Sequence, residues 1–149
     1  PTLTDGVIIT KAINVTAQTD TKTYDGTTDS SVSPKVDPLA SGDTIQTQPT
    51  QSFDTKDVGN GKTLTASGLV INDGNGGTNY TINYVSVDTG VIEVKPINVT
   101  AQADTKTYDG TTVSNVSPKG DTLEGTDTWT SEGTQVFSQS DVGDNLTLT

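Results

Sequence analysis

The stretch INVTAQTDTKTYDGTT, residues 13–28, returns almost unchanged as INVTAQADTKTYDGTT, residues 97–112. Ile13 and Ile97 differ by 84 positions, and the same offset aligns residues 6–65 with residues 90–149 without a gap. About 37 of the roughly 60 aligned positions are identical. A unit of this length is too long for a solenoid repeat and suits a small independent domain. The sequence therefore predicts tandem copies of one module.

Short stretches of each module alternate between apolar and polar residues. Ile13, Val15 and Ala17 would share one face of a strand, and similar runs cover residues 62–66, 80–84 and 90–94. The sequence has no long apolar run with a helical period, and Asp-Gly and Gly-Gly pairs mark turns. We predict an all-β fold of small antiparallel modules, with a β-sandwich as one arrangement.

Composition agrees with strands and predicts a small core. About 30 of the 149 residues are threonine, whose branched side chain suits a pleated sheet. Only 29% of residues are hydrophobic and the net charge is −11, a combination that also occurs in disordered chains. The strict repeat and the apolar alternation favour ordered modules with a small core.

The repeat sets the expected module boundaries. Residues 1–11 align with the closing strand of a preceding module, residues 12–94 form a complete module, and residues 95–149 form an incomplete one. Only Lys95-Pro96 joins the two, and proline restricts the backbone, so we expect a stiff joint and a rod of beads on a string. We also expect residues 6–10 to pair, as a strand, with the adjacent complete module or with the open end of another chain, head to tail.

Charge and residue types exclude several function classes. A pI near 4.1 argues against nucleic-acid binding, because phosphates would be repelled. The chain has no His and no Cys, which excludes a Ser-His-Asp triad, a thiol nucleophile and a zinc-thiolate site. We therefore predict no catalytic residues and no cofactor, and expect that the protein is not an enzyme.

The sequence gives no sign of membrane insertion or of a signal peptide, so we expect any export signal and anchor to lie outside this segment. A β-protein without cysteine fits a bacterial surface better than the disulfide-rich extracellular proteins of animals. We expect an extracellular location on a bacterial cell.

The heptapeptide KTYDGTT, at residues 22–28 and 106–112, resembles the signature of the YDG repeat domain. Phe53 with the following DVG at 57–59, the NY pair at 79–80 and the strand at 90–95 resemble other elements of that family. The resemblance implies that the chain is part of a large bacterial surface adhesin, a class that includes filamentous-haemagglutinin-like exoproteins. The related MBG modules imply that each module has a β-grasp-like topology. The signature residues are Tyr24, Asp25, Gly26, Tyr108, Asp109 and Gly110.

Few residues suggest a binding site. We interpret Tyr24-Asp25-Gly26 as a turn in which Asp25 accepts a backbone hydrogen bond. The loop at residues 72–79 is a weak calcium candidate, with oxygen ligands from Asn72, Asp73, Asn75 and Asn79. It lacks the EF-hand spacing and has one carboxylate, so a plain turn is favoured.

Other side chains suggest covalent chemistry or sugar contacts. Lys22, Lys56 and Lys62 are candidates for an intramolecular Lys–Asn isopeptide bond, and Asn-x-Thr sequons occur at Asn14, Asn79, Asn98 and Asn145. Such sequons arise readily by chance in a chain rich in Asn and Thr. Trp129 stands where the first module has Ile45, so we interpret it as a core or rim substitution.

Two functions remain. The repeats are a stalk that projects a distal adhesive region from the cell, or each repeat itself binds a glycan or a matrix protein. Aromatic residues are only 5% of the chain and fall mostly in apolar strands, which favours the stalk. The expected partners are neighbouring repeats and other stalks.

Overall fold

The computed structural model describes residues 2–149, which divide after Val94 into two compact units. The described residues contain strands and no helix, so the all-β prediction is confirmed. The strands of the first unit are β1 (Lys11–Thr16), β2 (Thr21–Thr23), β3 (Lys35–Val36), β4 (Thr44–Thr47), β5 (Thr50–Phe53), β6 (Gly59–Ser67), β7 (Val70–Asn72), β8 (Tyr80–Val85) and β9 (Val87–Glu93).

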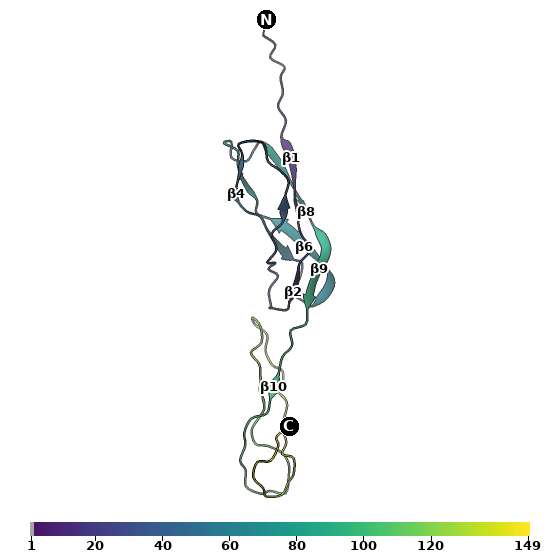
Figure 1. Cartoon of the computed structure of the whole chain (residues 1–149), viewed down its shortest axis with the longest axis vertical. Coiled ribbons are helices and arrows are strands. Elements are labelled where there is room, and N and C mark those ends of the chain that lie inside the picture. Colours follow the sequence, from purple (N-terminus) through teal and green to yellow (C-terminus); the bar gives the residue numbers. More distant parts are fainter. Residues whose placement is uncertain (1) are drawn as a thin grey trace. The chain divides into compact units, whose positions relative to one another are not determined.

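Three small sheets make up the first unit (Figure 1). One has the order β3-β1-β8, the largest has the order β2-β9-β6-β5, and β4 pairs with β7. β1 runs parallel to β8, with Ile13 opposite Ile82, and β2 runs parallel to β9, with Lys22 opposite Ile92. The remaining pairs of strands are antiparallel.

The expectation of purely antiparallel modules was therefore wrong in this detail. Parallel strands need a long crossover, and here the whole middle of the module connects the opening strands β1 and β2 to the closing strands β8 and β9. Apolar alternation has the same period in parallel and antiparallel strands, so it could not reveal the direction of pairing.

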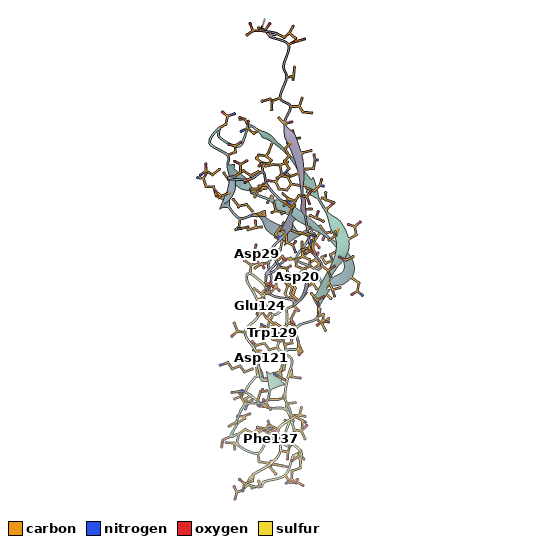
Figure 2. All side chains as sticks on the ribbon, turned by 45° about the horizontal axis from the view of Figure 1, so that its top comes forward. Asp20, Asp29, Asp121, Glu124, Trp129 and Phe137 are labelled. Atoms are coloured by element: carbon orange, nitrogen blue, oxygen red, sulfur yellow. The ribbon has the colours of Figure 1, made fainter. Side chains whose placement is uncertain are left out.

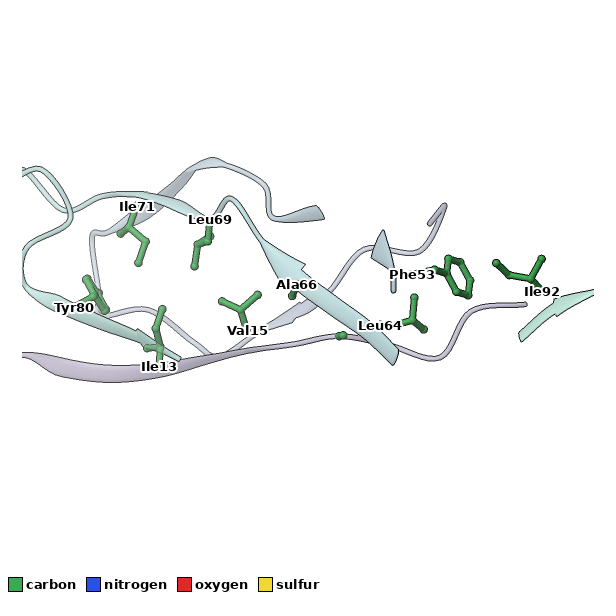
Figure 3. Close-up of a cluster of buried hydrophobic side chains, with 10 residues drawn as sticks. Ile13, Val15, Phe53, Leu64, Ala66, Leu69, Ile71, Tyr80 and Ile92 are labelled. Carbon is green, nitrogen blue, oxygen red and sulfur yellow. The ribbon is translucent and has the colours of Figure 1, made fainter. Parts of the chain in front are cut away.

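The core of the first unit is one elongated cluster of buried side chains, in which Ile71 and Leu69 face Ile13 and Val15 (Figure 3). The alternation in β1 buries Ile13 and Val15, and that in β6 buries Leu64 and Ala66. Each large aliphatic side chain removed from water contributes about 1.5–3 kcal/mol. The buried hydrophobic residues are Ile13, Val15, Ala17, Phe53, Leu64, Ala66, Leu69, Ile71, Tyr80 and Ile92.

The segment before β1 behaves differently from our expectation. Residues 2–10 form no strand, and the side chains of Val7, Ile8 and Ile9 are exposed. The pairing of residues 6–10 with the complete module beside them does not occur in this structure, where the segment runs as an extended trace away from β1 (Figure 1). Pro1, which belongs to the closing strand expected at residues 1–11, lies outside the described residues.

The second unit, residues 95–149, contains two short strands, β10 (Val99–Thr100) and β11 (Lys119–Gly120), which pair antiparallel. Ile97 and Val99 are 45% and 49% exposed, whereas their counterparts Ile13 and Val15 in the first unit are 1% and 0% exposed. In the first unit β1, which holds Ile13 and Val15, pairs with both β3 and β8, whereas β10 pairs with β11 alone.

Candidate functional site

The Tyr-Asp-Gly turn, which we define as Lys22, residues 24–27 and Asp29, is organised by a lysine. The ammonium of Lys22 donates to the carboxylate of Asp25 at 2.8 Å, to the carbonyl of Thr27 at 2.9 Å and to the carbonyl of Asp29 at 2.9 Å. It also lies 5.3 Å from the centre of the Phe53 ring, within range of a cation–π contact. The lysine therefore joins three points of one loop to the edge of the core.

Asp25 closes the turn from the other side. One carboxylate oxygen, Oδ1, accepts from Lys22 and also from the backbone N–H and the hydroxyl of Thr27, both at 2.9 Å. The hydrogen bond from Lys22 is the main reason that the pKa of Asp25 falls from 3.8 to about 2. A carboxylate held ionised in this way is a poor general acid or base near neutral pH.

Gly26 gives the turn its direction. Its φ is +76°, in the left-handed region that residues with a Cβ rarely adopt. Tyr24 is half-buried against the core, and the ammonium of Lys56 lies 5.9 Å from its ring centre. Each of the three signature residues thus has a structural role in one turn.

The second repeat builds the same turn. Lys106 donates to Asp109 at 2.9 Å, to the carbonyl of Thr111 at 2.8 Å and to the carbonyl of Val113 at 2.9 Å. Its ammonium lies 5.6 Å from the Phe137 ring, and the pKa of Asp109 is again lowered to about 2, chiefly by Lys106. The turn therefore forms even in the unit that has fewer strands, which shows that it is held by local contacts.

Of the remaining signature residues of that repeat, Gly110 matches its counterpart in the first repeat and Tyr108 does not. Gly110 has the same φ of +76° as its counterpart. Tyr108 is exposed, unlike half-buried Tyr24, since the second unit has less core to cover its ring.

A second polar cluster lies in the interior of the first unit, and we call it the Gln-Ser-Asp cluster: Gln18, Asp20, Ser30 and Gln51. The amide oxygen of Gln51 accepts from the backbone N–H of Gln18 at 2.7 Å, while its nitrogen donates to the Gln18 carbonyl at 2.8 Å and to the Ser30 hydroxyl at 3.0 Å. Ser30 in turn donates to buried Asp20 at 2.6 Å. Figure 2 marks Asp20 and Asp29 in this region.

The cluster satisfies buried polar groups that would otherwise cost stability. Its copy in the second repeat has nearly the same distances: Gln135 accepts from the N–H of Gln102 at 2.7 Å and donates to Ser114 at 3.0 Å. Ser114 donates to Asp104 at 2.7 Å and is the main cause of a lowered pKa at that carboxyl.

Sequence reasoning missed the Gln-Ser-Asp cluster. The available signal was that Gln51 and Gln135 are identical across the repeats although several of their neighbours differ. Gln18 and Gln51 are 33 residues apart, so no local pattern could place them together. Only the recurrence of both glutamines, which are uncommon buried residues, indicated a shared role.

The calcium candidate loop is filled by its own backbone. Oδ1 of Asp73 accepts from the N–H groups of Asn75 at 2.8 Å and Gly77 at 2.7 Å, and Oδ2 accepts from the N–H of Asn79 at 3.1 Å. These bonds lower the pKa of Asp73, with the bond from Gly77 contributing most. Asn72 accepts weakly from Gly74 at 3.5 Å. Residues 2–149 contain no group of three or more acidic side chains that could hold a metal ion.

The lysines considered for an isopeptide bond make other contacts. Lys22 contacts the Tyr-Asp-Gly turn, Lys56 faces Tyr24, and Lys62 donates to Thr55 at 2.5 Å and lies 3.6 Å from Asp54. None of these contacts involves an asparagine.

Two of the sequon asparagines have structural hydrogen bonds. Asn14 donates from its backbone and its side chain to Asp37, both at 2.9 Å, and Asn98 binds Asp121 in the same way at 2.8 and 2.9 Å. A glycan on either asparagine would attach to the Nδ2 atom that donates to this aspartate. Trp129 is half-buried, and its indole N–H donates to the Asp121 carbonyl at 3.2 Å (Figure 2).

Both repeated clusters use carboxylates, amides and an ammonium to fix backbone groups of the same unit.

A groove of about 440 Å³ lies in the second unit and is lined by residues 103–106 and 139–148, among others. The described residues contain no helix able to cross a membrane.

In a comparison with protein families, the model of the YDG domain matches residues 9–88 and, separately, residues 93–149. Neither the curated proteins nor the solved structures gave a match.

Proposed function

We propose that this chain, which belongs to the YDG domain family, is part of the stalk of a bacterial extracellular adhesin, where its repeats hold a distal adhesive region away from the cell. The observation that carries the proposal is the set of hydrogen bonds that the two repeats share. The side chains of the Tyr-Asp-Gly turn and of the Gln-Ser-Asp cluster recur with the same partners, and those partners are largely backbone groups of their own unit. The repeated residues serve the fold of each module.

A spacer also needs a defined joint between modules. Val94 ends the first unit and Lys95 begins the second, where its ammonium pairs with Glu124 of the same unit. Pro96 restricts its own φ and the conformation of the residue before it. The sequence at this boundary is Lys-Pro, in contrast to the glycine and serine residues of a flexible tether.

Chemistry on a substrate has little support in the chain. The carboxylates of Asp25 and Asp109 are held by lysine and backbone donors, and the sequence offers no His to act as a base near pH 7. We infer a structural, non-enzymatic protein. The absence of Cys and the abundance of Thr suit an exported module that depends on hydrogen bonds.

The rival function, binding of a glycan or a matrix protein by each repeat, makes a different prediction. We expect no binding above background when the purified chain is tested on arrays of glycans and of extracellular matrix proteins. Saturable binding that is lost when exposed side chains of one repeat are changed would contradict the spacer proposal.

A further inference from the structure

The Gln-Ser-Asp cluster places a hydroxyl between a carboxylate and an amide in the interior of the first unit. The hydroxyl of Ser30 donates to Oδ2 of Asp20 at 2.6 Å and accepts from Nε2 of Gln51 at 3.0 Å. Asp20 and Gln51 are only 6% and 4% exposed. A base, a nucleophile and an acyl group in this order are the parts that acyl transfer requires.

The amide of Gln51 also has a hydrogen-bond donor on its oxygen side. Its Oε1 atom accepts from the backbone N–H of Gln18 at 2.7 Å. When a nucleophile attacks the carbon of an amide, negative charge develops on the oxygen, and a backbone N–H in this place stabilises that charge. The fourth member of the cluster therefore supplies the donor that an acyl transfer needs.

The second repeat holds the same four groups. Ser114 donates to Oδ2 of Asp104 at 2.7 Å and accepts from Nε2 of Gln135 at 3.0 Å. Oε1 of Gln135 accepts from the N–H of Gln102 at 2.7 Å, and Gln135 is 1% exposed. The chain therefore carries two copies of one arrangement, and each copy is an internal control for the other.

We propose that Ser30 and Gln51 join in an intramolecular ester bond, and that Ser114 and Gln135 do the same. The serine Oγ forms a bond to Cδ of the glutamine, while the aspartate takes the proton of the hydroxyl. The C–N bond of the amide then breaks, and the aspartate returns the proton to the nitrogen, which leaves as ammonia. One hydroxyl and one primary amide give one ester and one ammonia, with no change of oxidation state and no co-reactant.

The attack needs a turn of the glutamine amide, because the serine lies on its nitrogen side. The terminal torsion of glutamine is broad and allows such a turn. Nε2 is bonded directly to Cδ, so a hydroxyl 3.0 Å from Nε2 is already near the carbon. An amide is a poor acyl donor and a carboxylate is a weak base, so we expect the ester to form slowly after folding, with the hydrogen-bonded cluster as the starting form.

The ester would join two parts of the module that are 21 residues apart in sequence. A covalent link of this kind restricts the unfolded chain and so stabilises the folded one. The burial of Asp20 and Gln51 keeps water from the bond and slows its hydrolysis. The reaction occurs once in each module and turns over no substrate, so it is independent of the stalk proposal and agrees with a protein that is not an enzyme.

Mass spectrometry tests the proposal on the whole chain, freshly purified and after days near body temperature at mildly alkaline pH. We expect the mass to fall by one ammonia for each ester, and therefore by two at completion. Trypsin cleaves after lysine, so the first ester should leave residues 23–35 joined to residues 36–56 after digestion. Hydroxylamine, which cleaves esters, should separate these two peptides.

Three variants of the first repeat assign the roles. Ser30→Ala removes the nucleophile, and Asp20→Asn removes the base at almost unchanged size, so each should leave a loss of only one ammonia, from the second repeat. Asp29→Asn is the matched control, because Asp29 is exposed and adjoins Ser30 in sequence (Figure 2). We expect this control to form both esters. Far-UV circular dichroism and the ester of the second repeat show whether each variant is folded.

An unchanged mass after incubation of the folded chain would overturn the proposal. A loss of ammonia that persists in Ser30→Ala combined with Ser114→Ala would also overturn it, since that loss would come from succinimide formation at asparagine. If Asp29→Asn prevented the first ester as fully as Asp20→Asn, Asp20 would not be the base, and the mechanism would be wrong.

Discussion

Gly120 lies directly against the indole of Trp129: a Cβ placed on Gly120 would come within 2.2 Å of the ring. The aligned residues of the first repeat are Val36 and Ile45, both partly buried beside the core. At these two aligned positions one repeat has two medium side chains, and the other has glycine and a very large side chain. Compensation of volume at one site is the expected response of a close-packed structure.

The first prediction uses this exchange. Gly120→Val should destabilise the second unit by about 1–3 kcal/mol, because the added side chain overlaps the ring. The double variant Gly120→Val with Trp129→Ile reproduces the pair of the first repeat and should recover most of that loss. Urea unfolding followed by far-UV circular dichroism measures both, and Trp129, the single tryptophan, adds a fluorescence signal for Gly120→Val. A double variant no more stable than Gly120→Val would contradict the compensation.

The second prediction concerns the Gln-Ser-Asp cluster. Gln51→Met keeps the approximate volume of the buried side chain but removes its bonds to Ser30 and to the partly buried backbone groups of Gln18. We expect a loss of about 1–3 kcal/mol in the free energy of unfolding. Gln48→Met, at an exposed position, is the control and should be close to neutral. Equal effects of the two variants would show that the cluster does not stabilise the unit.

The third prediction is a pH dependence. The pKa of Asp25 and of Asp109 is about 2 in the folded chain against an ordinary value of 3.8, so ionised carboxylate stabilises the fold above about pH 4 and this stabilisation is lost as the pH falls towards 2. Lys22→Met should raise the pKa of Asp25 towards 3.8 and leave Asp109 unchanged. Carboxyl chemical shifts in an NMR titration report both. A shift at both residues, or at neither, would contradict a local lysine contact.

The fourth prediction concerns calcium. Because three backbone N–H groups already bind the carboxylate of Asp73, calcium would have to displace them. We expect the melting temperature to be the same in millimolar calcium and in chelator. A rise of many degrees with calcium would mean preferential binding to the folded state, and the loop would then be a metal site.

Much of the fold could be predicted from the sequence because its signals are local. Alternation in residues 13–18 and 80–84 predicted strands that the structure places in β1 and β8. Their parallel pairing could not be predicted, because Ile13 and Ile82 meet only after a crossover through the whole module. A pattern with a period of two residues carries no information about that connection.

The two polar clusters also differ in how far they could be predicted from local sequence. The Tyr-Asp-Gly turn is local in sequence, with Lys22 and Asp25 three residues apart, and turn chemistry indicates it directly. The Gln-Ser-Asp cluster joins Gln18 to Gln51 across 33 residues, so its geometry depends on tertiary structure. The exposure of Ile97 and Val99 also could not be read locally, since their sequence matches that of the buried residues in the first repeat.

The most direct test of the spacer proposal is the distance between the two units in solution. The chain has no cysteine, so Ser67→Cys and Thr130→Cys place one spin label on an exposed site in each unit. If Lys95 and Pro96 make a stiff joint, pulsed electron–electron double resonance gives one narrow distribution of the distance between the two spin labels. This distribution should broaden when Lys95→Gly and Pro96→Ser replace the linker. A distribution that is already broad with the native linker, or that stays the same after the replacement, would contradict the stalk.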